Sequence, residues 1–285
     1  MNALRIDIDG YLKTALDRHL EKTDGKTPKN LSDSIRYSLL GPGKRIRPRL
    51  LLACAEMLKL KDEAAIPAAA TLEMLHCFTL VHDDLPCMDD DDIRRGRPSN
   101  HKQFGEAVAL LAGDALLALS MEVFLDATPH VEPARFLKGL SRLLWCMGPR
   151  GVTGGQAAEL LMNSKSNLED LIQLHSQKTG SLFSASLLIP MDFAGVTEDS
   201  AQGLALELFA KELGIAFQVS NDLEDATDEP VLPTNVLFYV DRISAQSNTL
   251  RRLETAMRSL SSSWNAGASR LLQIAEEVVK KLETH

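Results

Sequence analysis

The chain has 285 residues, of which 45% are hydrophobic and 5% aromatic, and its formal net charge is −8. This length suits one large domain or two small ones with a substantial core. The negative balance argues against a nucleic-acid partner. Four cysteines without a CxxC pair favour free thiols in a reducing compartment. With no signal-peptide pattern and no run of about 20 uncharged apolar residues, we expect a cytoplasmic protein without stable membrane association.

Apolar residues recur at spacings of three and four along most of the chain, which is the pattern of amphipathic helices. The predicted helices cover residues 3–20, 31–40, 47–60, 64–84, 105–127, 133–148, 168–195, 199–226, 240–258 and 266–283. No strand alternation and no internal repeat is evident, so we predict an all-α fold. We expect a single-domain bundle of about ten or more helices over residues 1–285. The helices at 64–84 and 199–226 are apolar around much of their circumference and are expected near its centre.

A basic turn, Gly43–Pro48, leads into the helix predicted at 47–60. Cations beside a helix N-terminus suit a phosphate group, and Lys44 and Arg47 are the candidates. Taken alone, this turn is just as well explained as a solvated basic loop.

A dense acidic run begins where the helix predicted at 64–84 ends. Asp83 and Asp84 precede Pro86, which disfavours helical geometry at Leu85, so the chain is expected to turn there and bring Asp89 back beside Asp83. Acids this close repel one another unless a cation holds them, and Mg²⁺ combines one or two carboxylates with substrate phosphates. Three arginines, at 94, 95 and 97, follow at once and suit the phosphate side. The run therefore predicts a Mg²⁺ and diphosphate site.

Two further segments carry polar groups on predicted helices. Lys178-Thr179-Gly180 lies within the helix at 168–195, where glycine costs about 1 kcal/mol relative to alanine, which indicates close approach of a ligand or another backbone. Near the end of the helix at 199–226, Asn221 and Asp225 are four residues apart, with Asp222 between them and Glu229 one turn further on. These acids form a second candidate metal cluster, opposite the first. Thr153–Gln156 is interpreted as a plain loop entering a helix.

In this order the motifs resemble the short-chain trans-isoprenyl diphosphate synthases of the farnesyl and geranylgeranyl type. The resemblance rests on Gly43–Pro48, His76, Asp83–Asp89, Arg94–Gly96, Phe104–Asp114, Gly154–Gln156, Lys178–Gly180 and Phe217–Gln218. It implies an all-α bundle around a deep central cavity, usually as a homodimer. The implied reaction is a Mg²⁺-dependent condensation of isopentenyl diphosphate with an allylic diphosphate, dimethylallyl or geranyl, involving about three Mg²⁺ ions.

The resemblance also implies roles for individual residues. Metal ions would be held by Asp83, Asp84, Asp89, Asn221, Asp222 and Asp225, and Arg94 and Lys178 would contact the allylic diphosphate. Isopentenyl diphosphate would be bound by Lys44, Arg47, His76 and Arg95. Thr179 and Gln218 are further candidates for substrate binding. Phe78 and Thr79 lie five and four residues before Asp83. In the family, bulky side chains at these positions form the floor of the growing-chain cavity. The large Phe78 therefore predicts a mainly fifteen-carbon product, farnesyl diphosphate, with geranylgeranyl diphosphate as the alternative.

The second acidic cluster departs from the family pattern. Asn221 stands where the family has an aspartate, and residues 228–235 contain no lysine or arginine, although family members carry lysines in this segment. Two alternatives therefore stay open. One is a class I terpene cyclase on the same fold, because Asn221, Asp225 and Glu229 are similar to the metal triad of those enzymes. The other is a weakly active or regulatory subunit of a heteromeric synthase.

Overall fold

The computed structural model describes residues 7–21, 27–225 and 231–284, and its chain forms two compact units. Residues 1–52 and 61–131 form the first unit, and residues 53–60 and 132–285 form the second. The described residues are mostly helical, with thirteen α-helices, which confirms the predicted all-α class. The single-domain organisation over residues 1–285 stays a prediction.

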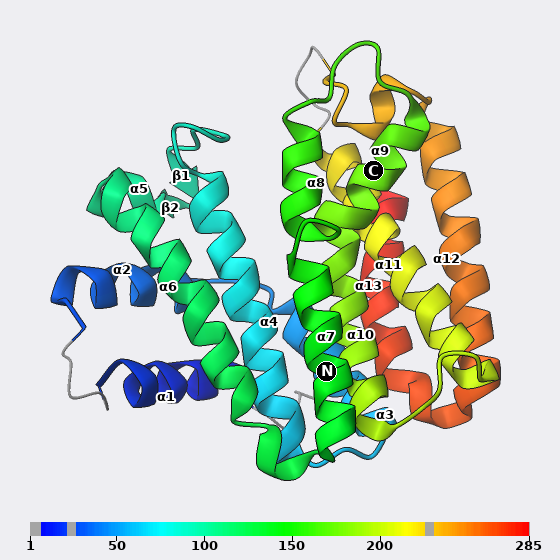
Figure 1. Cartoon of the computed structure of the whole chain (residues 1–285). Helices are drawn as coiled ribbons and strands as arrows, with labels where there is room; N and C mark the ends of the chain where they lie inside the picture. Colours follow the sequence, from blue (N-terminus) through cyan, green and yellow to red (C-terminus); the bar gives the residue numbers. More distant parts are fainter. Residues whose placement is uncertain (1–6, 22–26, 226–230, 285) are drawn as a thin grey trace. The chain divides into compact units, whose positions relative to one another are not determined.

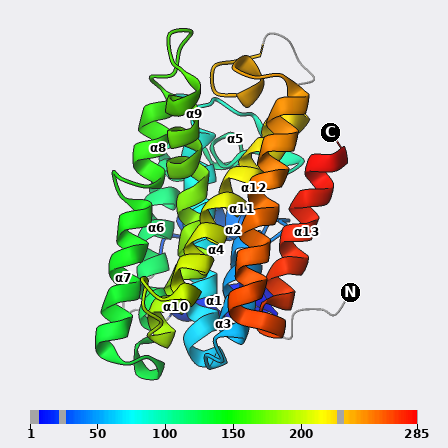
Figure 2. The same ribbon diagram turned by 90° about the vertical axis from the view of Figure 1, so that its right-hand side faces the viewer.

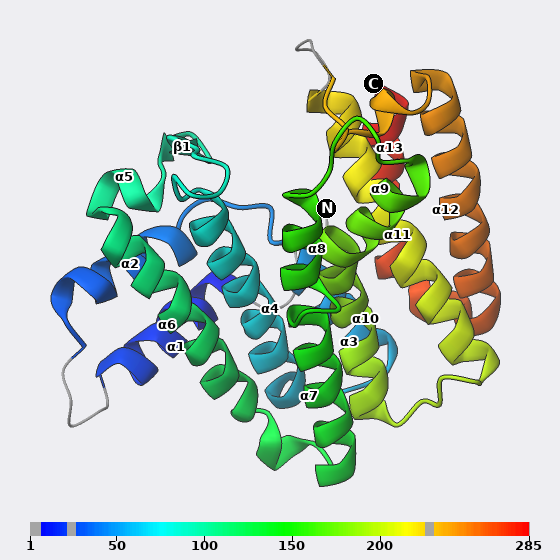
Figure 3. The same cartoon turned by 45° about the horizontal axis from the view of Figure 1, so that its top comes forward.

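The first unit packs its helices around α4. Its elements are α1 (Ile8–Glu21), α2 (Lys29–Leu39), the start of α3 (Ile46–Met57), α4 (Asp62–Asp83), β1 (Ile93–Arg94), β2 (Arg97–Pro98), α5 (Asn100–Phe104), α6 (Glu106–Leu125) and the 3-10 turn η1 (Thr128–His130). Helix α4 lies along α6, and α2 and α5 pack against α6 as well (Figure 3). The central position predicted for the helix at 64–84 is confirmed within this unit, because most of α4 is buried.

A short hairpin follows α4 in a segment that shows no strand pattern in its sequence. Strands β1 and β2 pair antiparallel, with Arg94 opposite Arg97. The two residues between them, Arg95 and Gly96, have φ values of 56° and 74°. Two positive φ values in a two-residue connection match a type I′ turn, which suits the twist of a hairpin. Since each strand has only two residues, no alternation could appear in the sequence, and this hairpin leaves the all-α class unchanged.

The second unit is a bundle around α11. Its elements are the end of α3, α7 (Pro133–Met147), α8 (Val152–Glu159), α9 (Leu168–His175), the π-helical segment η2 (Ser176–Gly180), α10 (Ser181–Ala194), α11 (Ala201–Asp225), η3 (Val236–Phe238), α12 (Arg242–Trp264), η4 (Asn265–Ala268) and α13 (Ser269–Thr284). Helix α11 contacts α10, α12 and α13 directly (Figures 1 and 2). Phe209 and Leu213 on α11 are fully buried. The predicted central position of the helix at 199–226 is thus confirmed within this unit.

Two differences from the predicted helices involve glycine. The predicted loop Thr153–Gln156 lies inside α8, because its glycines are selected by packing and not by turn formation. A Cβ at Gly155 would lie 2.4 Å from the backbone nitrogen of Lys178, so only glycine allows this contact. The helix predicted at 168–195 is continuous, but residues 176–180 adopt π-helical geometry. Such segments occur frequently at functional sites.

Two helical segments are long and apolar enough to cross a membrane by length and composition alone, α4 and residues 106–130. Charged residues interrupt both stretches, so neither is a run of about 20 uncharged apolar residues, and the absence of stable membrane association stays a prediction. Of the most apolar 18 residues in each segment, 72% are buried in α4 and 44% are buried in residues 106–130. A core helix satisfies the same criterion, so this finding assigns no membrane.

Candidate active site

The end of α4 and the turn after it bring two aspartates together. Helix α4 stops at Asp83, and the backbone N–H of Asp89 donates to the carbonyl oxygen of Asp83 at 2.8 Å. Asp89 is exposed and Asp83 is partly exposed. The expected break at Leu85-Pro86 is therefore present, and it places Asp89 beside Asp83 as the sequence predicted.

Asp84 points to a different partner. Its side chain is buried, and its Oδ1 accepts a hydrogen bond from Arg94 Nε at 2.8 Å. Arg94 also donates to Asp91 at 2.7 Å. Burial raises the pKa of Asp84 above its ordinary value, and the Arg94 guanidinium opposes that shift. Asp84 therefore anchors Arg94 in this structure, and its role as a metal ligand stays a prediction.

A cluster of cations surrounds His76, which lies on α4 about two turns before Asp83. Burial and the nearby charges of Arg47 and Arg95 lower the pKa of His76 well below its ordinary value, so the imidazole is neutral at pH 7. Arg47 is buried, and burial lowers its pKa to about 10, which still leaves it protonated. The buried acid of this cluster is Glu73, whose Oε1 lies 3.9 Å from Arg95. Positive charge exceeds negative charge here, which favours an anionic ligand.

Arg45 and Glu73 are the residues of this cluster that sequence reasoning missed. Arg45 is buried and donates to Glu73 Oε1 at 2.6 Å and to the carbonyl oxygens of Leu39 and Gly41. A Cβ at Gly43 would lie 3.1 Å from guanidinium nitrogens of both Arg45 and Arg95, so the turn passes directly beside them. Arg45 thus holds the basic turn in place, whereas the predicted ligand Lys44 is exposed. No signal in the sequence separates these adjacent cations.

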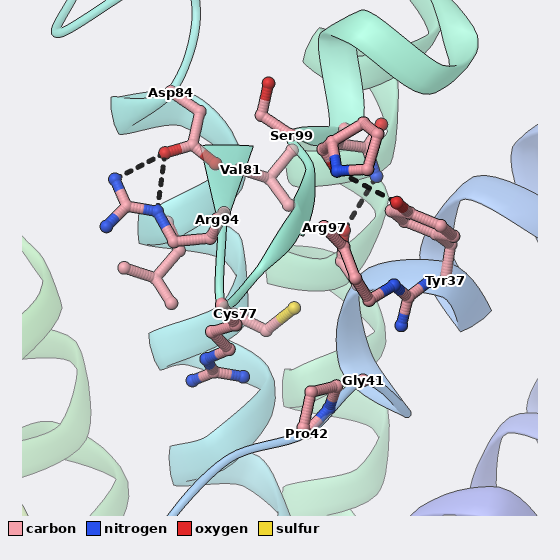
Figure 4. Close-up of a pocket in the computed structure, with 14 residues that line it drawn as sticks. Tyr37, Gly41, Pro42, Cys77, Val81, Asp84, Arg94, Arg97 and Ser99 are labelled. Carbon is pink, nitrogen blue, oxygen red and sulfur yellow. Dashed lines mark hydrogen bonds and ion pairs between the residues drawn. The ribbon is translucent and has the colours of Figure 1, made fainter. Parts of the chain in front are cut away.

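A pocket lies beside this cluster in the first unit (Figure 4). It is lined by Arg94, Arg95 and Arg97 from the hairpin, by Asp84 and Cys77 from the α4 segment, and by Tyr37 from α2. The guanidinium carbon of Arg97 lies 3.8 Å from the centroid of the Tyr37 ring, and the Tyr37 hydroxyl donates to the Pro98 carbonyl at 2.9 Å. Sequence reasoning gave Arg97 no specific role. The type I′ hairpin therefore delivers three arginines to one concave surface.

Phe78 and Thr79 lie on the last turns of α4, ahead of Asp83. Phe78 is partly exposed and packs edge-to-face on His82, with ring centroids 5.2 Å apart. The Thr79 hydroxyl donates to the carbonyl oxygen of His76 at 2.9 Å. Phe78 is thus not part of the buried core, and its predicted role in limiting chain length stays open to experiment.

In the second unit, Lys178 and Thr179 lie in the π-helical segment. Gly155 of α8 packs against the backbone of Lys178, and a Cβ at Gly214 of α11 would lie 2.9 Å from Gly180 Cα. The close backbone approach predicted for Gly180 is therefore present. The Lys178 ammonium forms an ion pair with Glu159 of α8, a partner that sequence reasoning missed.

The second acidic cluster is held by a chain of hydrogen bonds. The Thr179 hydroxyl donates to Gln218 Oε1 at 2.7 Å, and Gln218 Nε2 donates to Asp222 Oδ1 at 2.9 Å. The other Asp222 oxygen accepts from the backbone N–H of Val236 at 2.8 Å. Burial raises the pKa of Asp222 to about 7. Both carboxylate oxygens of Asp222 are therefore already bonded within the protein.

Asn221 and Asp225 lie on either side of this buried aspartate. Asn221 Oδ1 accepts a hydrogen bond from Lys281 Nζ of α13 at 2.7 Å. Asp225 is exposed at the end of α11, and partial desolvation of its carboxyl, followed by the negative charge of the neighbouring Glu224, raises its pKa. Glu229, the further candidate ligand, lies outside the described residues. Sequence reasoning missed Lys281, which is 60 residues away from Asn221 in the chain.

Burial of two facing titratable groups predicts opposite pH dependences of stability. His175 Nε2 lies 3.6 Å from Asp222 Oδ2, and burial lowers the pKa of His175 to about 4. From about pH 4 to 7, native Asp222 binds more protons than the unfolded chain does, so its contribution to the unfolding free energy falls as pH rises. From about pH 4 to 6.5, native His175 binds fewer protons, so its contribution rises.

As the pH rises from about 4.5 to 6.5, the unfolding free energy of Asp222→Asn should therefore rise relative to that of wild type. Over the same range the unfolding free energy of His175→Gln should fall relative to that of wild type. Urea unfolding at several pH values in that range measures both differences. Parallel profiles for all three proteins would contradict the assignment of two neutral buried groups.

The two acidic clusters differ in how well they suit a divalent cation. Mg²⁺ takes carboxylate oxygens and keeps several of its waters. Asp83 and Asp89 meet this requirement, because both carboxylates reach solvent at a turn closed by a backbone hydrogen bond. Ligand atoms of Asp90 and Asp92, from the same acidic run, and of His101 on α5 also lie within 4.8 Å of one another. Asn221 and Asp222 fit poorly, since their oxygens accept from Lys281, Gln218 and Val236.

Comparisons with known proteins identify the family of this chain and support its fold. The all-α fold, an acidic helix end and an adjacent arginine cluster define a protein of the isoprenoid synthase type. The polyprenyl synthetase family model matches residues 28–232. The chain belongs to the polyprenyl synthetase family, which confirms the resemblance found in its motifs.

Relatives of this chain include synthases of different product length. It is 41% identical over 204 residues to a chloroplastic geranylgeranyl pyrophosphate synthase of Capsicum annuum, covering 71% of this chain and 55% of that protein. It is 40% identical over 216 residues to a farnesyl diphosphate synthase of Geobacillus stearothermophilus, covering 75% and 71%. The chain thus spans little more than half the length of the plant relatives that it matches.

Solved structures show the same fold. A geranyltransferase from Legionella pneumophila superposes with a TM-score of 0.86 at 30% identity, covering 97% of this chain and 96% of that one. An FPP/GFPP synthase from Zymomonas mobilis superposes with a TM-score of 0.84 at 30% identity, covering 95% and 98%.

Proposed function

We propose that the protein is a prenyltransferase that condenses isopentenyl diphosphate with an allylic diphosphate, dimethylallyl or geranyl diphosphate. The proposed product is farnesyl diphosphate, with geranylgeranyl diphosphate as the alternative. The observation that carries the proposal is that α4 carries His76 within an arginine cluster and ends at Asp83, beside which the following turn places Asp89. Family membership supports it, and the relatives named for both products leave the chain length to experiment.

The proposed roles follow from charge and placement. Asp83 and Asp89 would hold Mg²⁺, which supplies Lewis-acid stabilisation of the departing diphosphate. Arg94, oriented by Asp84, would contact that allylic diphosphate. Arg47 and Arg95 would bind the diphosphate of isopentenyl diphosphate, with neutral His76 as a hydrogen-bond partner and Lys44 from the exposed turn.

The reaction would proceed by loss of diphosphate from the allylic carbon, attack of the isopentenyl double bond on the resulting cation, and loss of a proton. Cations aimed at the leaving group stabilise the charge that develops on it. In the second unit we propose that Lys178, Thr179 and Gln218 bind substrate as well, since a π-helical segment and a hydrogen-bond chain fix their positions. In the second cluster, Asp225 has an exposed carboxylate that suits a metal ion. We expect about three Mg²⁺ ions in the whole site when substrate is bound.

The assay that tests this function supplies the purified protein with isopentenyl diphosphate and each allylic diphosphate, with and without Mg²⁺, and identifies products by mass spectrometry. Longer prenyl diphosphates, formed only with Mg²⁺, are the expected result. Hydrocarbons or alcohols from an allylic diphosphate alone would indicate a terpene cyclase. No product from the chain alone would favour a subunit of a heteromeric synthase.

We also propose that the protein is a homodimer. We expect it in the cytoplasm, where it neither associates stably with a membrane nor binds nucleic acid. Helix α6 carries a stripe of exposed leucines, with Leu110 47% exposed, Leu111 55%, Leu117 37% and Leu125 53%. An apolar stripe on a helix of this length suits contact with a second copy better than contact with water.

Leu111→Asp is expected to shift the protein from dimer to monomer, because a carboxylate would be buried without a partner in the interface. Sedimentation velocity at micromolar concentration measures the change. Leu161→Asp is the matched control, since Leu161 is 77% exposed and lies in the second unit. A wild-type protein that sediments as a monomer would refute the dimer.

A further inference from the structure

Lys281 of α13 brings a positive charge into the second acidic cluster. Its ammonium donates to Asn221 Oδ1 at 2.7 Å and lies 2.7 Å from Glu224 Oε2. It also lies 5.9 Å from the centroid of the Phe217 ring. One ammonium thus contacts three residues of α11 within two turns, including the amide that replaces the aspartate expected from the family pattern.

The position of Lys281 is fixed by its neighbours. Leu282 is fully buried and Val278 nearly so, and the Leu282 carbonyl accepts a hydrogen bond from Gln246 of α12 at 2.6 Å. The side chain of Lys281 is only 22% exposed, whereas Lys280 beside it is exposed. A lysine held in this way differs from a mobile surface cation, since packing of α13 has already restricted it.

A metal ion and this ammonium compete for the same oxygen. Mg²⁺ binds oxygen at about 2.1 Å, so an ion on Asn221 Oδ1 would lie within about 5 Å of the Lys281 nitrogen. Two cations so close repel each other strongly where water is partly excluded. The neutral amide of Asn221 is also a weaker ligand than a carboxylate but a good acceptor for an ammonium.

We propose that the Lys281 ammonium takes the place of a divalent cation at Asn221 and Glu224, so that this cluster binds fewer metal ions than one with an aspartate at position 221 and no lysine. Lys281 thereby also supplies a cation to the cluster, although residues 226–235 contain none. The inference rests on the proposed function only in treating the cluster as part of a diphosphate site.

The test counts ions directly and needs no turnover. Mn²⁺, read by electron paramagnetic resonance in the presence of inorganic pyrophosphate, is the probe. The double variant Asn221→Asp with Lys281→Met is expected to bind one Mn²⁺ more than wild type. Asn221→Asp alone should gain none, because its new carboxylate pairs with Lys281. Lys281→Arg, which keeps the charge, and Lys280→Met, the matched control, should bind as many ions as wild type.

An equal count in wild type and the double variant would overturn the proposal, and so would a gain in Asn221→Asp alone. If the ion pair of Lys281 is purely structural, Lys281→Met should change the melting temperature. The double variant Asn221→Asp with Lys281→Met should then bind no additional Mn²⁺. Product formation is measured separately. A protein that makes no prenyl diphosphate but shows the extra ion would refute the proposed function and leave this inference standing.

Discussion

Replacing Asp83 with alanine is expected to lower kcat by several orders of magnitude while the fold is retained. Asp83 ends α4, and its carbonyl oxygen, not its side chain, accepts the hydrogen bond from Asp89 that closes the turn. Alanine keeps that backbone contact and removes only the carboxylate. The diphosphate would then be poorly neutralised as negative charge develops on it, and each loss of about 1.4 kcal/mol in transition-state stabilisation is a tenfold loss of rate.

Steady-state kinetics at saturating Mg²⁺, with far-ultraviolet circular dichroism as a check of folding, measure this effect. Asp62→Ala is the matched control, because Asp62 is an exposed aspartate at the opposite end of the same helix. It should keep turnover near that of wild type. Turnover of Asp83→Ala close to the wild-type value would remove the basis for a metal site at the end of α4.

Phe78→Ala is expected to lengthen the product from fifteen carbons to twenty or more. Five residues separate Phe78 from Asp83, which at about 1.5 Å per residue places the ring roughly 7.5 Å along α4 from the proposed diphosphate site. Phe78 is partly exposed, and its ring contacts His82. Its removal should therefore open space along the helix without creating a large cavity in the core.

The opposing variant is Thr79→Phe, which adds bulk at the neighbouring position and should keep the product at fifteen carbons or shorten it. Mass spectrometry of the products from each variant, with dimethylallyl and geranyl diphosphate as starters, gives the chain-length distribution. If Phe78→Ala is active and folded but yields the wild-type distribution, the phenylalanine does not limit chain length.

The sequence by itself determined the helical architecture of this protein and the location of its acidic helix end. Helix periodicity is local, so α4 and α11 could be predicted within a few residues from their apolar pattern. The turn that brings Asp89 to Asp83 could also be predicted, because Pro86 restricts the residue before it. Here steric rules within a short segment decide the structure.

Only the tertiary structure decided which of several similar residues does what. Arg45 and Lys44 are neighbours in the sequence, yet Arg45 is buried on Glu73 while Lys44 is exposed, because the pairing depends on α4 packing beside the basic turn. In the sequence Gly155 is typical of a loop, but in the structure it lies in a helix and is required because the backbone of Lys178 packs against it.

The second acidic cluster shows the same division between local and long-range information. The replacement of an aspartate by Asn221 is plain in the sequence, but its electrostatic partner, Lys281, comes from a helix 60 residues away. A sequence pattern records which charges a segment carries. Which charges meet depends on the packing of whole helices, and that packing is decided by contacts spread over α11, α12 and α13.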